Sequence, residues 1–173
     1  MLSSSVDVRS SIPYVPELLI TGGQLGADYG ALLAAKSLGI PTGGFAPLGF
    51  KTEQGLRPEL GTVFGLLESA SSDYAVRTRQ NIELCNALIL IANKFESPGT
   101  RLTARLAFDY WVPVFEVPYS LALGLDSPYL VADIRSWLKE HTPGVLMCAG
   151  NRESVAPGIE RWTQQFLRAI FVD

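Results

Sequence analysis

The chain has 173 residues, of which 47% are hydrophobic and 18% charged, and its formal net charge is −3. This length and composition are typical of one compact domain with a sizeable core. The small negative charge excludes the strongly basic surface that drives non-specific nucleic-acid binding. The apolar runs are too short for a membrane helix, so we expect neither a nucleic-acid nor a membrane partner.

The first 16 residues contain no continuous apolar segment of the kind found in secretory signals, and we expect them to form a flexible N-terminal arm. Cys85 and Cys148 lie in apolar runs and lack CxxC spacing. This pattern favours buried free thiols over a disulfide or a metal site. A cytoplasmic protein is the interpretation that fits these features.

Short apolar runs alternate with segments of helical period from residue 17 to residue 173. This alternation predicts a single α/β domain, built as a sandwich with a mainly parallel sheet. The apolar runs predict strands over 17–21, 41–46, 63–68, 87–92, 113–117 and 144–149. The intervening segments predict helices over 27–38, 73–85, 100–111, 127–140 and 157–171.

A glycine-rich turn separates the first predicted strand from the first predicted helix. Glycine lets the backbone turn tightly and approach a ligand, and the first N–H groups of a helix favour an anion. The turn therefore predicts an anion-binding segment. Its candidate ligand-contacting residues are Gly22, Gly23, Gln24, Gly26 and Asp28.

Three further glycine-containing polar segments, 42–55, 97–103 and 150–158, follow later strands. The carboxyl ends of parallel strands meet at one edge of a sheet, so these segments are expected to share one cleft with the first turn. In the segment at 97–103, the helix start and its hydroxyls suit a phosphate. Its charge suits Arg101 of the same segment and Arg152 of the segment at 150–158. The candidates are Ser97, Gly99, Thr100, Arg101 and Arg152.

Several familiar sites are disfavoured by the sequence. The first turn lacks GxGxxG spacing and no acidic residue stands about 20 positions later, which argues against NAD or FAD. No Gly-Lys-Ser or Gly-Lys-Thr tripeptide supports an NTPase. The single histidine, His141, stands at a predicted helix end, so a Ser–His–acid set or a zinc site is disfavoured. We predict no catalytic set and no protein-bound metal.

Four sequence blocks resemble the molybdenum cofactor carrier family, which is related to the LOG-type lysine decarboxylase-like proteins. The similarity runs from about Leu18 to Phe171. The blocks are Gly22-Gly23-Gln24-Leu25-Gly26-Ala27-Asp28, Gly43-Gly44-Phe45-Ala46-Pro47-Leu48-Gly49 with Glu53, Asp73-Tyr74 with Arg77-Thr78 and Asn81, and the split pair Ser97 to Thr103 and Gly150-Asn151-Arg152-Glu153-Ser154. Departures from the family pattern are Leu25, Tyr29 and Leu48.

This resemblance implies a Rossmann-like three-layer sandwich. It also adds four ligand-contacting candidates to those above, namely Gly44, Glu53, Glu153 and Ser154. One face of the helix predicted over 73–85 carries Tyr74, Arg77, Thr78 and Asn81. This face forms either a surface that contacts a partner or a solvated stripe. The LOG-type relatives carry a glutamate thought to act in N-glycosidic bond cleavage. Thr103 stands at that position here, and a hydroxyl cannot replace a carboxylate in this role.

The leading hypothesis is therefore a non-catalytic carrier that binds, protects and transfers molybdenum cofactor, with the metal bound to the pterin. The alternatives are a phosphoribohydrolase-like enzyme acting on nucleotides or nucleotide sugars through Glu53 or Glu153, and a nucleotide sensor. The resemblance further implies a homo-oligomer, with an apolar helix such as 129–138 as a packing surface. Molybdoenzymes are the expected recipients of the ligand.

Overall fold

The computed structural model describes residues 12–120 and 128–172. The start of the expected arm, residues 1–11, and the predicted helix start at 127 lie outside these ranges. Residues 12–16 are described, and Tyr14 among them packs against the largest core cluster. The domain thus gains packing from residues just before the predicted boundary at 17.

A five-stranded sheet in the order β2-β1-β9-β7-β8 forms the centre of the molecule. Every neighbouring pair in this sheet is parallel. The central strands are buried on both faces, which explains their continuous apolar sequences. The strands are β1 (Leu18–Ile20), β2 (Thr42–Gly43), β7 (Ala87–Ala92), β8 (Val114–Pro118) and β9 (Val145–Gly150).

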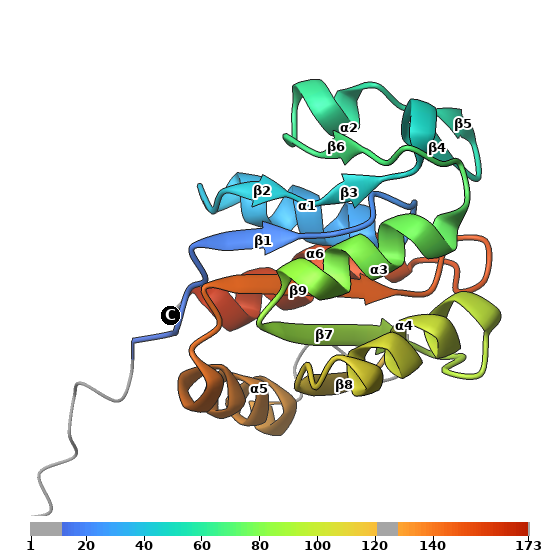
Figure 1. The fold of residues 1–173 in the computed structure, drawn as a ribbon. Coiled ribbons are helices and arrows are strands. Elements are labelled where there is room, and N and C mark those ends of the chain that lie inside the picture. Colours follow the sequence, from blue (N-terminus) through green and yellow to red (C-terminus); the bar gives the residue numbers. More distant parts are fainter. Residues whose placement is uncertain (1–11, 121–127, 173) are drawn as a thin grey trace, which may run out of the picture.

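Helices cover both faces of the sheet (Figure 1). On one face lie α1 (Ala27–Ser37), α5 (Pro128–His141) and α6 (Ile159–Phe171), and on the other lie α3 (Tyr74–Leu84) and α4 (Pro98–Asp109). Alternate residues of β7 divide between the two layers: Ile89 joins the core under α1, α5 and α6, whereas Leu88 joins the core under α3 and α4. The predicted α/β three-layer, Rossmann-like single domain is confirmed.

The segment between β2 and α3 differs from the prediction. It forms a small lobe of β3 (Phe45–Ala46), the 3₁₀ turn η2 (Leu48–Phe50), β4 (Lys51–Thr52), β5 (Gly55–Leu56), α2 (Glu59–Thr62) and β6 (Leu67–Glu68). The lobe has its own apolar cluster, in which Phe64 and Leu66 are buried. The strand predicted over 63–68 is therefore wrong for 63–66, because Phe64 and Leu66 fill this lobe and only 67–68 is extended.

The single strand predicted over 41–46 is broken at Gly44. Gly44 has φ 110°, and a Cβ there would lie 2.4 Å from the Thr21 carbonyl oxygen. Beyond it, β3 leaves the main sheet and pairs with β6. The Asn81 side chain bonds the Phe45 backbone on both sides, donating to its carbonyl at 3.0 Å and accepting from its N–H at 2.8 Å. This amide fixes the point where the small lobe begins.

Other sequence predictions can be compared directly. Cys85 and Cys148 are buried free thiols as expected, and burial raises the pKa of Cys85 to about 12.

The apolar residues Ile134 and Leu138 of α5 are buried in the domain's own core, which leaves Tyr129 of that helix exposed. Within the described ranges, no helix combines the length and the apolar character that membrane crossing requires.

Candidate functional site

A cavity of about 320 Å³ lies where β1 and β9 end and where α3 and α4 begin. Its walls come from the glycine turn, the first turn of α3, the first turns of α4 and the segment after β9. This is the carboxyl edge of a parallel sheet, where ligands of such folds bind. The glycine turn and the later segments at 97–103 and 150–158 thus meet at one cavity, as predicted, whereas the segment at 42–55, which was predicted to join them, does not line it.

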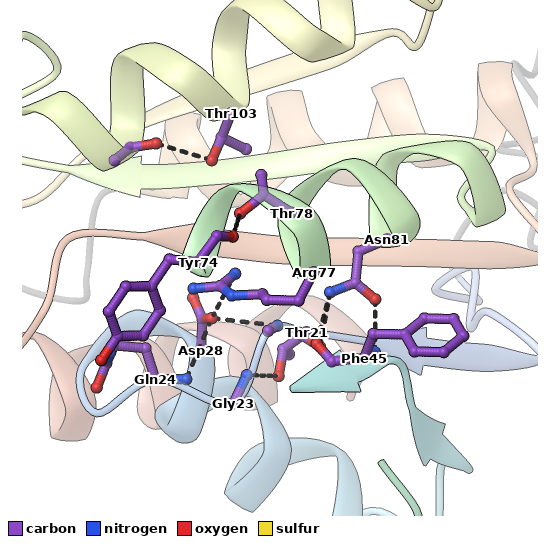
Figure 2. A network of polar contacts seen from close by, with 12 residues as sticks. Thr21, Gly23, Gln24, Asp28, Phe45, Tyr74, Arg77, Thr78, Asn81 and Thr103 are labelled. Carbon is purple, nitrogen blue, oxygen red and sulfur yellow. Dashed lines mark hydrogen bonds and ion pairs between the residues drawn. The ribbon is translucent and has the colours of Figure 1, made fainter. Parts of the chain in front are cut away.

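An ion pair between Arg77 and Asp28 forms one wall of the cavity. Arg77 extends from α3 toward Asp28 at the start of α1, with Tyr74 and Gln24 beside the pair (Figure 2). The Arg77 Nη1 atom lies 3.8 Å from Asp28 Oδ2. The same carboxylate oxygen accepts from the N–H groups of Gly22 at 3.2 Å and Gln24 at 3.4 Å. Asp28 therefore holds both the glycine turn and the arginine.

Gly22 explains how Arg77 comes so close to the turn. A Cβ at this position would lie 1.7 Å from Arg77 Nη1, so a side chain here would displace the guanidinium. Glycine is needed for this close approach and not for an unusual backbone angle. The sequence prediction put Gly22 in contact with the ligand, whereas the structure places an arginine against it.

Two buried donors at the cavity have no partner in the described part of the chain. Arg77 is 8% exposed and its Nε–H is unbonded, and Gln24 is 4% exposed with its Nε2 unbonded. The other end of the Gln24 amide is fully used, because Oε1 accepts from the N–H groups of Leu25 and Glu53. A buried donor without an acceptor costs roughly 1–3 kcal/mol, so both groups favour an acceptor-rich ligand.

The start of α4 contributes further donors. Pro98 is the first residue of this helix, and the N–H groups of Gly99 and Thr100 that follow have no partner within it. Asn151 fixes this helix start: its Oδ1 accepts from the N–H groups of Asn93 and Lys94, each at 3.0 Å, and its Nδ2 donates to the Lys94 carbonyl at 3.1 Å. The helix end is held rigidly at the cavity.

A hydroxyl pair at this helix start has one proton left over. Asn151 Nδ2 donates to Ser97 Oγ at 3.1 Å and to Thr100 Oγ1 at 3.0 Å. The two hydroxyl oxygens lie 2.9 Å apart, so one of their protons lies between them. The second proton has no acceptor among the described residues. It is available to a ligand oxygen in the cavity, which Ser97 and Thr100 both line.

Arg152 supplies a second cation at the cavity. Its Cζ lies 4.6 Å from the centre of the Tyr74 ring, a cation–π contact. In the described residues its guanidinium has neither a carboxylate nor a hydrogen-bond acceptor. Its backbone is anchored by an isolated bridge to Gly26. Arg152 therefore combines a fixed backbone with a side chain that is free to meet an anion.

The cavity carries more positive than negative charge. Arg77, Arg152 and Asp28 line it, and Asp28 is the carboxyl group among its described lining residues. Burial raises the pKa of Asp28, although Arg77 opposes this shift. Burial also lowers the pKa of Arg77, which Asp28 opposes and the nearby Arg152 reinforces. The repulsion between the two arginines favours binding of an anion between them.

A short hairpin closes one side of the site. Glu53, in the turn between β4 and β5, accepts hydrogen bonds from the N–H and the hydroxyl of Ser154, the N–H at 3.3 Å. Its own N–H donates to Gln24 Oε1 at 2.9 Å. The Glu53 carboxylate thus binds the segment after β9, and it does not line the main cavity. It connects the small lobe to two cavity residues.

The structure places the remaining predicted residues as follows. Gly23, Gly26 and Gly44 shape the turns behind the cavity without lining it. Glu153 accepts from the N–H groups of Gly158 at 2.5 Å and Glu160 at 3.0 Å, and so caps the start of α6. Arg101 is exposed on α4, away from the cavity lining. The candidates brought together at the cavity are Gln24, Asp28, Ser97, Gly99, Thr100, Arg152 and Ser154.

Sequence reasoning left several cavity residues out of its ligand-contacting set. Tyr74, Arg77 and Thr78 line the cavity, although the helix face that carries them fitted a solvated stripe equally well. Asn151 lines the cavity too, although the sequence analysis named only its neighbours Arg152, Glu153 and Ser154 as ligand-contacting candidates. The signal that could have found them is the helical spacing from Tyr74 to Asn81 together with the family motif.

The three departures from the family pattern lie outside the cavity lining. Leu25 is 4% exposed behind the turn, and Leu48 is 50% exposed on the small lobe. Tyr29 packs edge-on against Phe64 and under the Arg57 guanidinium. Thr103 does line the cavity, and its hydroxyl donates to the Gly99 carbonyl at 2.9 Å. No cluster of three or more potential metal ligands occurs in the ranges 12–120 and 128–172.

Comparison with known proteins supports this description. The family model of the circularly permuted YpsA SLOG family matches residues 19–171. The chain belongs to this family. A solved structure from Syntrophus aciditrophicus SB, described as a "putative molybdenum carrier protein", is 31% identical, with a TM-score of 0.82 over 93% of this chain and 97% of that one. Among curated proteins, none matches this chain. The family resemblance and the fold inferred from the sequence are both confirmed.

Proposed function

We propose that this protein binds and carries a small phosphorylated ligand, with molybdenum cofactor as the specific cargo. The observation that carries the proposal is a buried set of donors that lack acceptors at one cavity, namely Arg77 Nε, Gln24 Nε2 and one hydroxyl proton of the Ser97–Thr100 pair. Two arginines and a helix N-terminus add positive charge there. A phosphate matches this set, because it is anionic and rich in acceptors.

The family relationship supports the choice of cargo. The similar protein from Syntrophus is described as a "putative molybdenum carrier protein", and its fold matches that of this chain with a TM-score of 0.82. The start of α4, Thr100, Arg77 and Arg152 would hold the phosphate, and Gln24 and Tyr74 would contact the pterin. The molybdenum would arrive bound to the pterin, as part of the cargo.

The cavity favours binding over hydrolysis. A phosphoribohydrolase needs a carboxyl group free to act on the glycosidic bond. Glu53 is bonded to Ser154 and Glu153 caps α6, so neither of the predicted alternatives faces the main cavity. Asp28 faces it but is held by Arg77 and by two backbone N–H groups. A carrier needs hydrogen-bond donors at the cavity and no free carboxyl group.

Isothermal titration of the full chain with 6-hydroxymethylpterin phosphate and with unphosphorylated 6-hydroxymethylpterin tests the proposal. We expect the phosphorylated compound to bind at least about tenfold more tightly, since charge-assisted hydrogen bonds are worth roughly 1.5–3 kcal/mol each. AMP is included to detect release of free adenine. Equal affinity for the two pterins, or turnover of AMP that Asp28→Asn abolishes, would overturn the carrier proposal.

The proposal extends to the setting of the protein. We infer a cytoplasmic homo-oligomer that hands its cargo to molybdoenzymes, in keeping with the expectations from the sequence. Light scattering of the purified protein measures its molar mass in solution. A mass equal to the 18.8 kDa of one chain would reject the homo-oligomer. Incubation of the loaded protein with an apo-molybdoenzyme tests whether molybdoenzymes are recipients. The enzyme activity that is restored measures the transfer of the cofactor.

A further inference from the structure

The Tyr74 ring is surrounded by cations. Besides Arg152 at 4.6 Å, the Lys51 Nζ lies 5.6 Å and the Arg77 Cζ 5.9 Å from the ring centre. Of the carboxyl groups close by, Asp28 is engaged by Arg77 and Glu53 by Ser154. The face of this ring is therefore covered by a guanidinium that has no anionic partner in the described residues.

The two arginines beside the ring differ in how firmly they are held. Arg77 is buried and paired with Asp28. Arg152 is half-buried and contacts the ring alone. A partly exposed cation–π contact is weak beside a bidentate contact between a guanidinium and a phosphate. Arg152 is thus the group that an incoming anion can draw away from the ring.

Removing Arg152 from the ring would expose a flat aromatic face at the cavity. Tyr74 and Gln24, which lie near each other in Figure 2, line the same cavity. The Gln24 Nε2 is an unbonded, buried donor. A planar heteroaromatic ring stacked on Tyr74 would present its edge, where carbonyl and ring-nitrogen acceptors lie, to such donors. The geometry therefore offers one surface for the plane of a ring and one donor for its edge.

We propose that Tyr74 is the stacking surface for the flat ring of the ligand, and that Arg152 moves from Tyr74 to the ligand's anionic group on binding. This inference rests on the proposed function and adds to it the residue that selects a ring-bearing phosphate over phosphate alone. Gln24 is the accompanying donor to the ring edge. The ligand class is a planar heteroaromatic phosphate.

Two probes separate the roles: 6-hydroxymethylpterin phosphate, followed by its own fluorescence, and inorganic phosphate, followed by phosphorus NMR. Tyr74→Leu is expected to weaken pterin phosphate binding by about tenfold, because stacking on an aromatic side chain is worth that order of affinity, and to change phosphate binding by less than about twofold. Quenching of the bound pterin fluorescence should be lost in Tyr74→Leu, whereas Tyr74→Phe, which keeps an aromatic ring, should retain the affinity for pterin phosphate.

Arg152→Ala is expected to weaken the binding of both probes to a similar degree while the bound pterin remains quenched. Tyr129→Leu, at a tyrosine that is 81% exposed on α5, is the matched control and should change nothing. If Tyr74→Leu weakens both probes equally or neither, Tyr74 is not a stacking surface. If the unaltered protein binds neither probe, the proposed function fails, and the inference fails with it.

Discussion

Two pairs of buried polar side chains lie near the carboxyl edge of the sheet, and they differ in how completely they are bonded. Asn81 and Asn151 are 0% and 3% exposed, and both ends of each amide bond to backbone groups. Arg77 and Gln24 are buried to a similar degree, yet each keeps an unbonded donor. Similar burial therefore accompanies two different roles.

The difference separates structure from binding. A fully bonded amide stabilises the backbone around it and offers nothing to a ligand, so Asn81 and Asn151 hold the start of the small lobe and the start of α4. The desolvation free energy of a buried donor without an acceptor stays uncompensated until a ligand accepts its hydrogen bond. We expect changes in the first pair to affect folding and changes in the second pair to affect binding.

The largest effect is expected for Asn81→Ala. The change removes the donor to the Thr21 and Phe45 carbonyls and the acceptor for the Phe45 N–H, which leaves buried backbone groups unbonded. The free energy of unfolding should fall by about 3 kcal/mol, from roughly 1–3 kcal/mol per unsatisfied group. Urea unfolding measures it, with exposed Asn93→Ala as the control. A loss no larger than that of the control would show that this amide is not structural.

Arg77→Met is expected to weaken binding strongly, and it also leaves the buried Asp28 carboxylate without its cation. It removes the buried guanidinium and should weaken the binding of 6-hydroxymethylpterin phosphate by about 10- to 100-fold, as loss of a charge-assisted contact predicts. Arg101→Ala, at the exposed arginine of α4, is the matched control and should change affinity by less than about twofold. Titration calorimetry compares the two, and equal effects would mean that the choice of Arg77 over Arg101 is mistaken.

The pH dependence of stability should reveal Asp28. Its pKa is raised by burial, so the folded protein binds a proton more tightly there than the unfolded chain does. Stability from this group is then present below its unfolded pKa near 4 and is lost as pH rises through the raised folded value. In urea unfolding from pH 4 to pH 8, Asp28→Asn should lose less stability with rising pH than the unaltered protein. Parallel curves would contradict the raised pKa.

The smallest effect is expected for Glu53→Gln. The amide keeps one acceptor for Ser154 but loses the charge, so the hairpin should remain in place and bind less firmly. Affinity for pterin phosphate should fall by about two- to threefold, in line with an exposed contact. Hydrogen exchange over residues 51–56 should become faster. A loss as large as that of Arg77→Met would place Glu53 in direct contact with the ligand instead.

The sequence predicted the long elements better than the short ones. The predicted strand at 87–92 coincides with β7, because six consecutive apolar residues buried on both faces leave no alternative. The prediction over 41–46 and 63–68 was wrong in part, since Gly44 turns the chain away and Phe64 and Leu66 fill a separate small core. Local pattern carries no information on which core a short apolar run joins.

The site shows a similar limit. Thr100 and Arg152 were predicted from a helix start and a family block, and the structure brings both to one cavity. Arg77 was left undecided, because a polar helix face looks the same in sequence whether it meets solvent or a buried carboxylate. Its pairing with Asp28, 49 positions earlier in the chain, appears when the fold brings the starts of α1 and α3 to the carboxyl edge of the sheet.

Native mass spectrometry of the full chain, incubated with released molybdenum cofactor and separately with nucleoside monophosphates, tests the central claim most directly. We predict one cofactor bound per chain, with molybdenum present in the adduct, and a much smaller amount bound when Arg77 is replaced by methionine. Binding or cleavage of a nucleotide with no cofactor adduct would contradict the carrier account and favour a nucleotide enzyme or sensor.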